Sequence, residues 1–532
     1  MFEAAELGNA VSKADFNKQV PLLRTQLLEL QQKLRRANFP VLLVFAGVDG
    51  AGKSETVNLL NGWLDPRWVV THAYGRASED EAERPEFWRY WRDLPRRGAI
   101  GCYLSAWYSR PVLDHVYGKS TDAGLDEDLD RIIAFERPLA VDGAVILKFW
   151  MHLGKEAQKE RFESLEKDPL TSWRVTDADW EHWRMYDKFI ATAERTIMRS
   201  SFGRAPWHIV EGADERYRSL TVATIIRDAI ALRLEEYEAQ QRVAAEMEAS
   251  QESDKKKKAK KASKKADDDG DTLLGAGPGM PVPGISILQT LDMDVDMDRE
   301  TYTELLEKHQ GRLNHLSHQA NAKGLSSILV FEGWDAAGKG GAIRRITAPL
   351  DARNYQVIPI AKPTDEEYAH NHLWRFWRHL SRAGRVTIFD RSWYGRVLVE
   401  RLEGFATEAE WMRGYSEIND FEEQLVDHGI VLIKFWMHIT KEEQLKRFKA
   451  REKIAYKRWK LTDEDWRNRE KWDQYEHAVN DMIARTSTSI APWTLVEGNS
   501  KRFARIKTIS TFCDKLEEAL ARTGKGAQKG TK

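Results

Sequence analysis

The chain has 532 residues, of which 42% are hydrophobic, and a net charge of −1. This length exceeds that of one ordinary domain, and the near-zero charge excludes a global field that would attract nucleic acid or a membrane surface. Two cysteines, Cys102 and Cys513, are too few for a disulfide scaffold and suit a reducing compartment. The sequence has no secretory signal pattern and no apolar stretch of membrane-spanning length, so we expect a cytoplasmic protein without a membrane partner.

The sequence contains two copies of one pattern. The octapeptide GVDGAGKS at 47–54 recurs as GWDAAGKG at 333–340, an offset of 333 − 47 = 286 positions. The same offset relates the pentapeptide KFWMH at 148–152 to its repeat at 434–438. We therefore expect two domains of one fold in tandem, whose residues can be compared position by position.

In each copy, short apolar runs alternate with helical patterns. Strands that are almost continuously apolar and alternate with helices predict a parallel sheet covered by helices on both faces. The expected strands of the first copy are 40–45, 68–72, 99–104, 144–150 and 208–210, and those of the second are 327–331, 356–359, 386–389, 430–436 and 494–496.

The two copies are joined by a segment of different composition. A charged helix over 232–248 leads into a lysine run, an acidic block at 267–269 and a Gly/Pro stretch. This composition predicts a solvated, unfolded linker rather than a nucleic-acid or lipid contact. The expected organisation is a first domain at 1–235, a linker at 236–283, a second domain at 284–525 and a basic tail at 526–532.

Each octapeptide lies between an expected strand and an expected helix, which is the context of a phosphate-binding P-loop. Its glycines permit the tight turn in which successive N–H groups face phosphate oxygens, and Lys53 and Lys339 can reach the outer phosphates. The second copy has Gly340 where a Ser or Thr usually holds Mg²⁺. Asp49 and Asp335 lie inside the loops, where a carboxylate is favourable if it shares a metal ion with the phosphates.

The copies differ at the end of the third expected strand. Asp390 stands there in the second copy, at the position of a Walker-B-type acid that binds Mg²⁺, and Leu104 replaces it in the first. The next residue is Arg391 in the second copy and the uncharged Ser105 in the first. The second copy is therefore predicted to be catalytic and the first degenerate.

A second difference follows the fourth expected strand. The segment 446–460 of the second copy is strongly basic, with Glu452 as its only acid, whereas acids dilute the same segment of the first copy. A one-sided excess of cations favours phosphate binding by a lid. It exceeds what one nucleotide needs and suits a long polyanion.

These residues resemble the second polyphosphate kinase family, a P-loop group similar to thymidylate kinase. The resemblance is carried by EGWDAAGKGG at 332–341, FDRSWYGR at 389–396 and KRWKL at 457–461. The tandem form resembles the subgroup that phosphorylates AMP to ADP with inorganic polyphosphate. The implied fold is α/β, with two tandem thymidylate kinase-like P-loop domains, each a five-stranded parallel sheet with a helical lid.

The resemblance also implies a site in the second domain. Mg²⁺, or Mn²⁺ in its place, would be held by Asp335 and Asp390, and Lys339 and Arg391 would complete the catalytic set. The residues expected to bind phosphate or polyphosphate are Gly333, Gly338, Gly340, Gly341, Arg396, Lys434, Arg447, Arg451, Lys457, Arg458 and Lys460.

The implied reaction is phosphoryl transfer by positioning and charge neutralisation, with polyphosphate and AMP or ADP as partners and no specific nucleic acid. The sequence is compatible with a homo-oligomer. Three alternatives stay open at this point: a polyphosphate-dependent kinase that prefers ADP, an ordinary ATP-dependent nucleotide kinase, and a non-catalytic scaffold that binds polyphosphate or nucleic acid.

Overall fold

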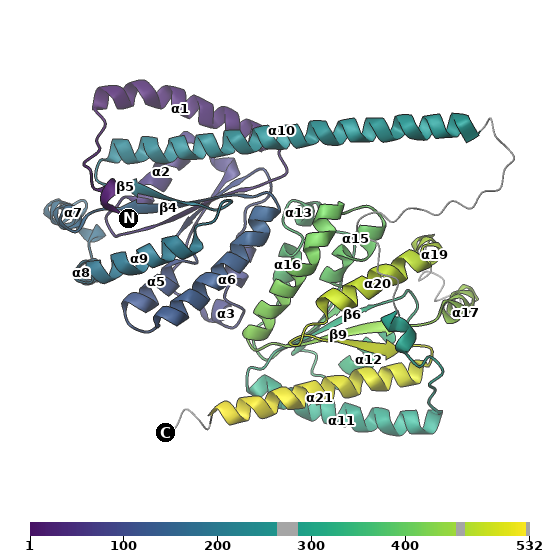
Figure 1. Ribbon diagram of the computed structural model, residues 1–532. Helices are drawn as coiled ribbons and strands as arrows, with labels where there is room; N and C mark the ends of the chain where they lie inside the picture. The colour runs from purple at the N-terminus through teal and green to yellow at the C-terminus, as the bar shows by residue number, and fades with distance from the viewer. Residues whose placement is uncertain (263–285, 454–462, 528–532) are drawn as a thin grey trace. The chain divides into compact units, whose positions relative to one another are not determined.

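The computed structural model describes residues 1–262, 286–453 and 463–527 (Figure 1). Residues 263–283 of the expected linker, the expected lid residues Lys457, Arg458 and Lys460, and the last five residues of the tail lie outside the described residues. We call the two copies the first and the second domain.

The described residues form two compact units. The first comprises Met1–Arg76, the chain from Asp93 to residue 262, and Tyr368–Asn371. The second comprises Ala77–Arg92, residues 286–367 and the chain from His372 onward.

The first domain is built on a five-stranded parallel sheet of order β2-β3-β1-β4-β5. The central strands are almost continuously apolar and buried, as expected for strands covered on both faces. The strands are β1 (Val41–Gly47), β2 (Val69–Ala73), β3 (Ile100–Leu104), β4 (Val145–His152) and β5 (Trp207–Glu211).

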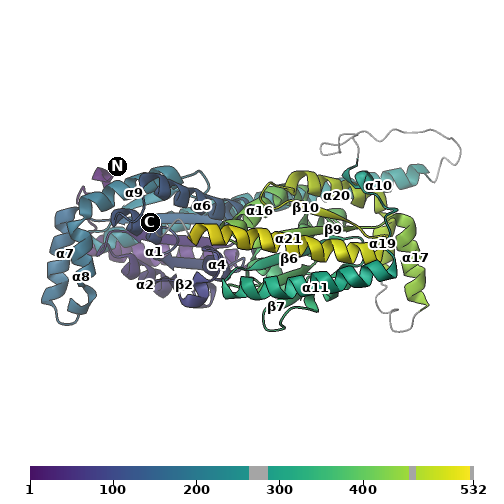
Figure 2. The same ribbon diagram turned by 90° about the horizontal axis from the view of Figure 1, so that it is seen from below.

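Helices cover both faces of this sheet. Helices α1 (Lys13–Leu34), α2 (Lys53–Trp63) and α10 (Glu215–Ala262) lie on one face, and α5 (Ser109–Val116), α6 (Asp122–Val141) and α9 (Tyr186–Ser200) lie on the other (Figure 1). Helices α7 (Lys155–Lys167) and α8 (Asp177–Arg184) lie side by side beyond one end of the sheet (Figure 2). Short 3₁₀ turns are η1 (Glu3–Ala5), η2 (Pro66–Trp68) and η3 (Ser172–Arg174).

The second domain repeats this architecture with the strand order β10-β9-β6-β8-β7. Its first strand, β6, is central and pairs with both β8 and β9, as β1 does with β3 and β4. The strands are β6 (Ser327–Gly333), β7 (Tyr355–Pro359), β8 (Val386–Asp390), β9 (Val431–His438) and β10 (Trp493–Glu497).

The second sheet is also covered on both faces. Helices α11 (Arg299–Ala322), α12 (Lys339–Thr347) and α21 (Lys501–Ala527) lie on one face, and α16 (Glu408–Asp427) and α20 (Trp472–Thr486) lie on the other (Figure 1). Helices α17 (Lys441–Glu452) and α19 (Asp463–Glu470) follow β9. Shorter elements are η4 (Ile287–Thr290), α13 (Asp365–Tyr368), α14 (Trp374–Trp377), η5 (Trp393–Arg396) and α15 (Val399–Leu402), and the second unit also contains α3 (Glu79–Ala82) and α4 (Trp88–Arg92).

The predicted fold class is confirmed. Each expected apolar run forms a strand, with ends that differ by a few residues, as in β4, which was expected at 144–150 and spans Val145–His152. Within the described part of the chain, no helix is both long and apolar enough to cross a membrane.

The expected linker differs from its prediction over residues 249–262. Helix α10 continues through the lysine run to Ala262, whereas composition predicted an unfolded segment there. The physical reason is that Lys, Ala, Glu and Gln are strong helix formers, so the backbone can stay helical without burying an apolar face.

Candidate functional site

The P-loop of the second domain connects β6 to α12. Gly333 ends the strand at φ 144°, and a Cβ atom there would lie 2.3 Å from the Met437 carbonyl oxygen of β9. Gly338 caps the helix in the left-handed region, at φ 113°. These two positions therefore require glycine, because L side chains rarely adopt such backbone angles. Lys339 begins α12, and its Nζ donates to the carbonyl oxygens of Gly333 at 2.6 Å and Trp334 at 3.4 Å, which folds the ammonium across the loop.

Asp390 lies beside this loop because of strand pairing. It ends β8, and its register partner on the adjacent β6 is Phe331, two residues before the loop begins. The Arg391 N–H donates to the Phe331 carbonyl oxygen at 3.0 Å and fixes the turn after β8. Ligands of parallel α/β sheets bind at this carboxyl edge. Within the described ranges, no hydrogen bond or ion pair occupies the Asp390 carboxylate.

Arg391 connects the two predicted acids. Its backbone is left-handed, at φ 65°, which is uncommon for a residue with a side chain. Its Nη2 lies 3.2 Å from Oδ1 of Asp335, and Nδ2 of Asn468, on α19, donates to Oδ2 of the same carboxylate at 3.0 Å. The structure thus brings Asp335, Lys339, Asp390 and Arg391 together at one edge of the sheet.

A buried acid at this edge escaped the sequence analysis. The Ser392 hydroxyl donates to Oε1 of Glu332 at 2.8 Å, and both side chains are buried. Burial raises the pKa of the Glu332 carboxyl above its usual range, although the charges of Lys339 and Arg391 oppose the shift. The first domain has Ala46 and Ala106 at the two positions, so the polar pair is a difference between the two copies that is visible in the sequence.

A cavity of about 320 Å³ lies beside the loop, between α12, α17 and α21. It is lined by the loop backbone, Gly341, and cations from both later helices, with Glu443 as the only acid among its lining residues. Arg451 was expected at such a site, whereas Lys501 and Arg505 were not. The basic residues are Lys446, Arg447, Arg451, Lys501 and Arg505.

Four of these five basic positions are not basic in the first domain, and only Arg447 keeps an arginine, Arg161. Lys446 corresponds to Glu160, Arg451 to Leu165, Lys501 to Glu215 and Arg505 to Ser219. A cationic cavity beside the P-loop is therefore a property of the second domain, and its position and charge suit a chain of phosphates.

Arg447 does not fit its predicted phosphate contact. Its side chain is buried, and all five of its N–H groups donate hydrogen bonds within the protein. The acceptors are the Glu443 carboxylate and the carbonyl oxygens of Ala336, Ala337, Gly498 and Asn499. No donor is left for a phosphate. Arg447 instead holds the P-loop backbone in place.

Lys434 also departs from its prediction as a phosphate-binding residue. Its ammonium is fully buried on β9 and donates to the Tyr394 hydroxyl at 2.9 Å, Glu422 Oε2 at 2.7 Å and the Thr486 carbonyl oxygen at 2.7 Å. Lys148 makes the equivalent contacts in the first domain. This network is kept in both copies, including the one that lacks a counterpart of Asp390, so it supports the core of the fold rather than a phosphate site.

The remaining predicted residues are placed as follows. Gly340 lies in the first turn of α12, and Gly341 lines the cationic cavity. Arg396 lies on η5, beyond the turn that carries Arg391, and its Nε is 3.3 Å from a Glu400 carboxylate oxygen. Among the described residues, no group of three or more His, Cys, Asp or Glu side chains is arranged to hold a metal ion, so the candidate set is the pair of Asp335 and Asp390.

The P-loop of the first domain is filled by its own side chains. The Asp49 carboxylate lies 2.7 Å from His182 Nδ1 and 3.5 Å from Lys53 Nζ. Burial raises the pKa of Asp49, but Lys53 and His182 outweigh it and lower that pKa to about 2. The position of His182 is Asn468 in the second domain. The charge that a metal ion would neutralise is therefore already neutralised by protein groups.

A second ion pair fills the same loop. The Arg218 guanidinium is buried, donates to Glu55 Oε2 at 3.0 Å, and lies so close to Gly52 that a Cβ there would be 2.2 Å from its Cζ atom. In the second domain these positions are Ala504 and Gly341, which line the cavity instead. The loop shape is thus kept in the first domain, while the space beside it is taken.

Comparisons with known proteins show the family of the chain. The family description "Polyphosphate kinase 2" matches residues 10–238 and again 296–524. The chain is 48% identical over 522 residues to a polyphosphate:AMP phosphotransferase of Pseudomonas aeruginosa PAO1, covering 98% of this chain and 99% of that one. It is 43% identical over 527 residues to a protein of the same name from Pseudomonas syringae pv. tomato, covering 99% of this chain and 100% of that one.

A solved structure gives the same result. A crystal structure described as a polyphosphate kinase 2 from Pseudomonas aeruginosa PA01 superposes with a TM-score of 0.82 at 45% identity, covering 98% of this chain and 99% of that chain. The family match spans most of the chain, and both relatives are covered almost end to end. The chain therefore belongs to the polyphosphate kinase 2 family.

Proposed function

We propose that this protein transfers the terminal phosphoryl group of inorganic polyphosphate to AMP, giving ADP. Two relatives that align over nearly the full chain carry the name polyphosphate:AMP phosphotransferase. The residues of the site supply what phosphoryl transfer needs, namely a phosphate-binding loop, cations and a pair of carboxylates.

We further propose that the reaction takes place in the second domain. The observation that carries this proposal is the paired difference between the two loops. Asp335 and Asp390 both lie at the carboxyl edge of the second sheet, whereas in the first domain Leu104 replaces the second acid and Arg218 and His182 fill the loop.

In the proposed reaction, an oxygen of the AMP 5′-phosphate attacks the terminal phosphorus of polyphosphate. A new P–O bond forms to AMP, the bond to the next phosphate breaks, and the shortened chain leaves with the bonding electron pair. Lys339 and Arg391 offset the charge that spreads over the oxygens of the transferred group. The attacking phosphate is already ionised near neutral pH, so the site needs no strong general base.

Mg²⁺, with Mn²⁺ as a substitute, is proposed as the cofactor. The donor set fits, because Mg²⁺ is usually bound by one or two carboxylates together with substrate phosphates, and Asp335 and Asp390 offer hard oxygen ligands at the loop. When bound, the ion would neutralise phosphate charge and align the two substrates.

A single assay tests the function. The purified full chain is given Mg²⁺ and polyphosphate together with AMP, GMP, ADP or GDP in separate reactions, and ATP is offered as an alternative donor. We expect phosphorylation of AMP with polyphosphate as the donor. A preference for ADP, or turnover with ATP and none with polyphosphate, would contradict the proposal.

We also propose that the protein works in the cytoplasm, in keeping with two cysteines that are both buried and unpaired. Localisation of a tagged chain tests this proposal. We also propose that the chain forms a homo-oligomer. Light scattering after size-exclusion chromatography measures the mass of the species in solution.

A further inference from the structure

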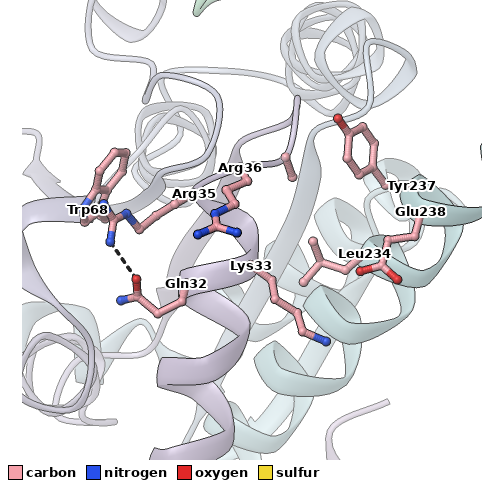
Figure 3. A pocket seen from close by; sticks show the side chains of 9 residues that line it. Gln32, Lys33, Arg35, Arg36, Trp68, Leu234, Tyr237 and Glu238 are labelled. Atoms are coloured by element: carbon pink, nitrogen blue, oxygen red, sulfur yellow. Dashed lines mark hydrogen bonds between the residues drawn. The ribbon is translucent and has the colours of Figure 1, made fainter. Parts of the chain in front are cut away.

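A second cavity lies in the first domain, away from its P-loop. It measures about 550 Å³ and opens where α1 ends, between that end, η2 and α10. Figure 3 shows Lys33, Arg35 and Arg36 from the end of α1 and Trp68 from η2 on one side, with Tyr237 and Glu238 from α10 on the other.

The cavity carries unneutralised positive charge. Three basic side chains line it against one acid, Glu238. In the described ranges, neither the Lys33 ammonium nor the Arg36 guanidinium has a hydrogen-bonding or ionic partner. Free cations around a concave surface attract anions and gain most from groups with several acceptor oxygens, such as phosphates.

The aromatic side chains indicate a phosphate chain rather than a nucleotide base. The Trp68 ring is covered by two guanidinium groups, with Arg35 Cζ 4.5 Å and Arg96 Cζ 4.2 Å from the ring centroid. The Tyr237 ring packs edge-on against Phe39, with 5.9 Å between centroids. Arg35 is further fixed by its hydrogen bond to Gln32 at 2.6 Å (Figure 3). The Trp68 ring therefore positions cations instead of offering an open face for a base to stack on.

The second domain has no equivalent of this cluster. At the matching positions, Lys33 becomes Gln319, Arg35 becomes Asn321, Arg36 becomes Ala322 and Trp68 becomes Asn354. The first domain has fewer cations than the second beside its P-loop, yet it has more of them here. Because the number of cations differs in the opposite direction at the two places, we expect this cavity to have a role separate from that of the P-loop.

We propose that this cavity is a second binding site for inorganic polyphosphate, carried by the domain that does not catalyse. The proposal rests on the proposed function for the identity of the polyanion. Lys33, Arg35 and Arg36 bind phosphate oxygens, and Trp68 holds Arg35 in position. The first domain then contributes a polymer-binding surface in place of chemistry.

Titration calorimetry of the full chain with tripolyphosphate tests the proposal, because so short a probe fills each site separately. We expect two bound molecules per wild-type chain and one per chain of the double variant Lys33→Glu/Arg36→Glu. The control Lys18→Glu, a single charge reversal on the exposed face of α1 outside the cavity, should still bind two. A neutral double variant, Lys33→Gln/Arg36→Ala, copies the second domain and should weaken the first-domain site about tenfold or more, the factor for losing one charge-assisted hydrogen bond.

Three outcomes overturn the proposal: one molecule bound to the wild type, two bound to a folded double variant, or ATP displacing the probe from this site more strongly than longer polyphosphate does. The AMP phosphorylation assay on the same wild-type sample keeps the two proposals apart. If that sample makes ADP from polyphosphate but the double variant still binds two, only this inference fails. If it makes no ADP, the proposed function fails.

Discussion

The Ser392 hydroxyl donates a 2.8 Å hydrogen bond to the buried carboxyl of Glu332, and both positions are alanine in the first domain. The pair joins the end of β6 to the turn that follows Asp390 and carries Arg391. It is absent from the domain that also lacks those two residues, so it belongs to the same site.

Glu332→Ala should destabilise the protein and lower its turnover. The change leaves the buried Ser392 hydroxyl without its acceptor, which costs about 1–3 kcal/mol of unfolding free energy, and it frees the turn that positions Arg391. Glu332→Gln keeps an acceptor oxygen and should recover most of the stability. Urea unfolding and turnover of both variants test this, and wild-type turnover of Glu332→Ala would show that the pair does not position the site.

Asp390→Asn should abolish transfer, by about 10²–10³-fold or more, while the fold stays intact, because an amide is a poor ligand for Mg²⁺ and carries no charge. The matched change in the first domain, Leu104→Ala, removes a half-buried leucine and should cost about 1 kcal/mol of stability without comparable loss of turnover. Steady-state kinetics over a range of Mg²⁺ concentrations, with circular dichroism as the check on folding, measures both. Near-normal turnover of Asp390→Asn would contradict the assignment of Asp390 as a metal ligand.

Charge reversal in the cationic cavity should affect the donor more than the acceptor. Arg451→Glu and Arg505→Glu should raise the KM for polyphosphate more than that for AMP, because both cations line the space beside the P-loop. Polyphosphate affinity should also fall steeply with added salt, by the counterion release known for nucleic acids. The control Lys308→Glu makes the same charge change at an exposed position of α11. An equal rise of both KM values would indicate general damage to the domain.

The His182–Asp49 pair should be visible in a pH titration. The hydrogen bond from His182 to Asp49 raises the pKa of the imidazole above its usual value, although burial opposes the shift. Because the pKa is raised, this contribution to stability is complete below about pH 6.5 and is lost as the pH rises through the raised value. On the acid side it is lost as the pH falls from about 3.8 towards the lowered pKa of Asp49, about 2.

Histidine NMR of the full chain measures this pKa, with His182→Asn used to assign the signal. We expect a midpoint above the ordinary range and a return towards it in Asp49→Asn. A midpoint at or below the ordinary value in the wild type would mean that the loop carboxylate is not occupied by His182.

Much of the fold could be predicted because its signals are local. A parallel strand buried on both faces is an almost unbroken apolar run, so β4 and β9 are visible in the sequence. The P-loop and the acid at the end of β8 follow from motif and strand position. Helix α10 extends beyond the expected end at 248 because its Lys, Ala and Glu residues favour a helix even where no apolar face is buried.

The errors and omissions share a different cause. The sequence does not say which cation is buried, so Lys434 and Arg447 were assigned to phosphate although one lies in the core and the other holds the loop backbone. Lys501 and Arg505 lie far along the chain from the loop, and only the packing of α21 against α12 brings them to the cavity. Tertiary contacts of this kind leave no local pattern.

The central claim is that only the second domain transfers phosphate, and turnover of two matched loop variants tests it most directly. Lys339→Ala should reduce AMP phosphorylation by orders of magnitude, because it removes the cation that spans the P-loop. Lys53→Ala, the same change in the loop already filled by Arg218 and Glu55, should leave turnover largely unchanged. If a well-folded Lys53→Ala protein loses as much activity as Lys339→Ala, both loops take part in catalysis and the claim is wrong.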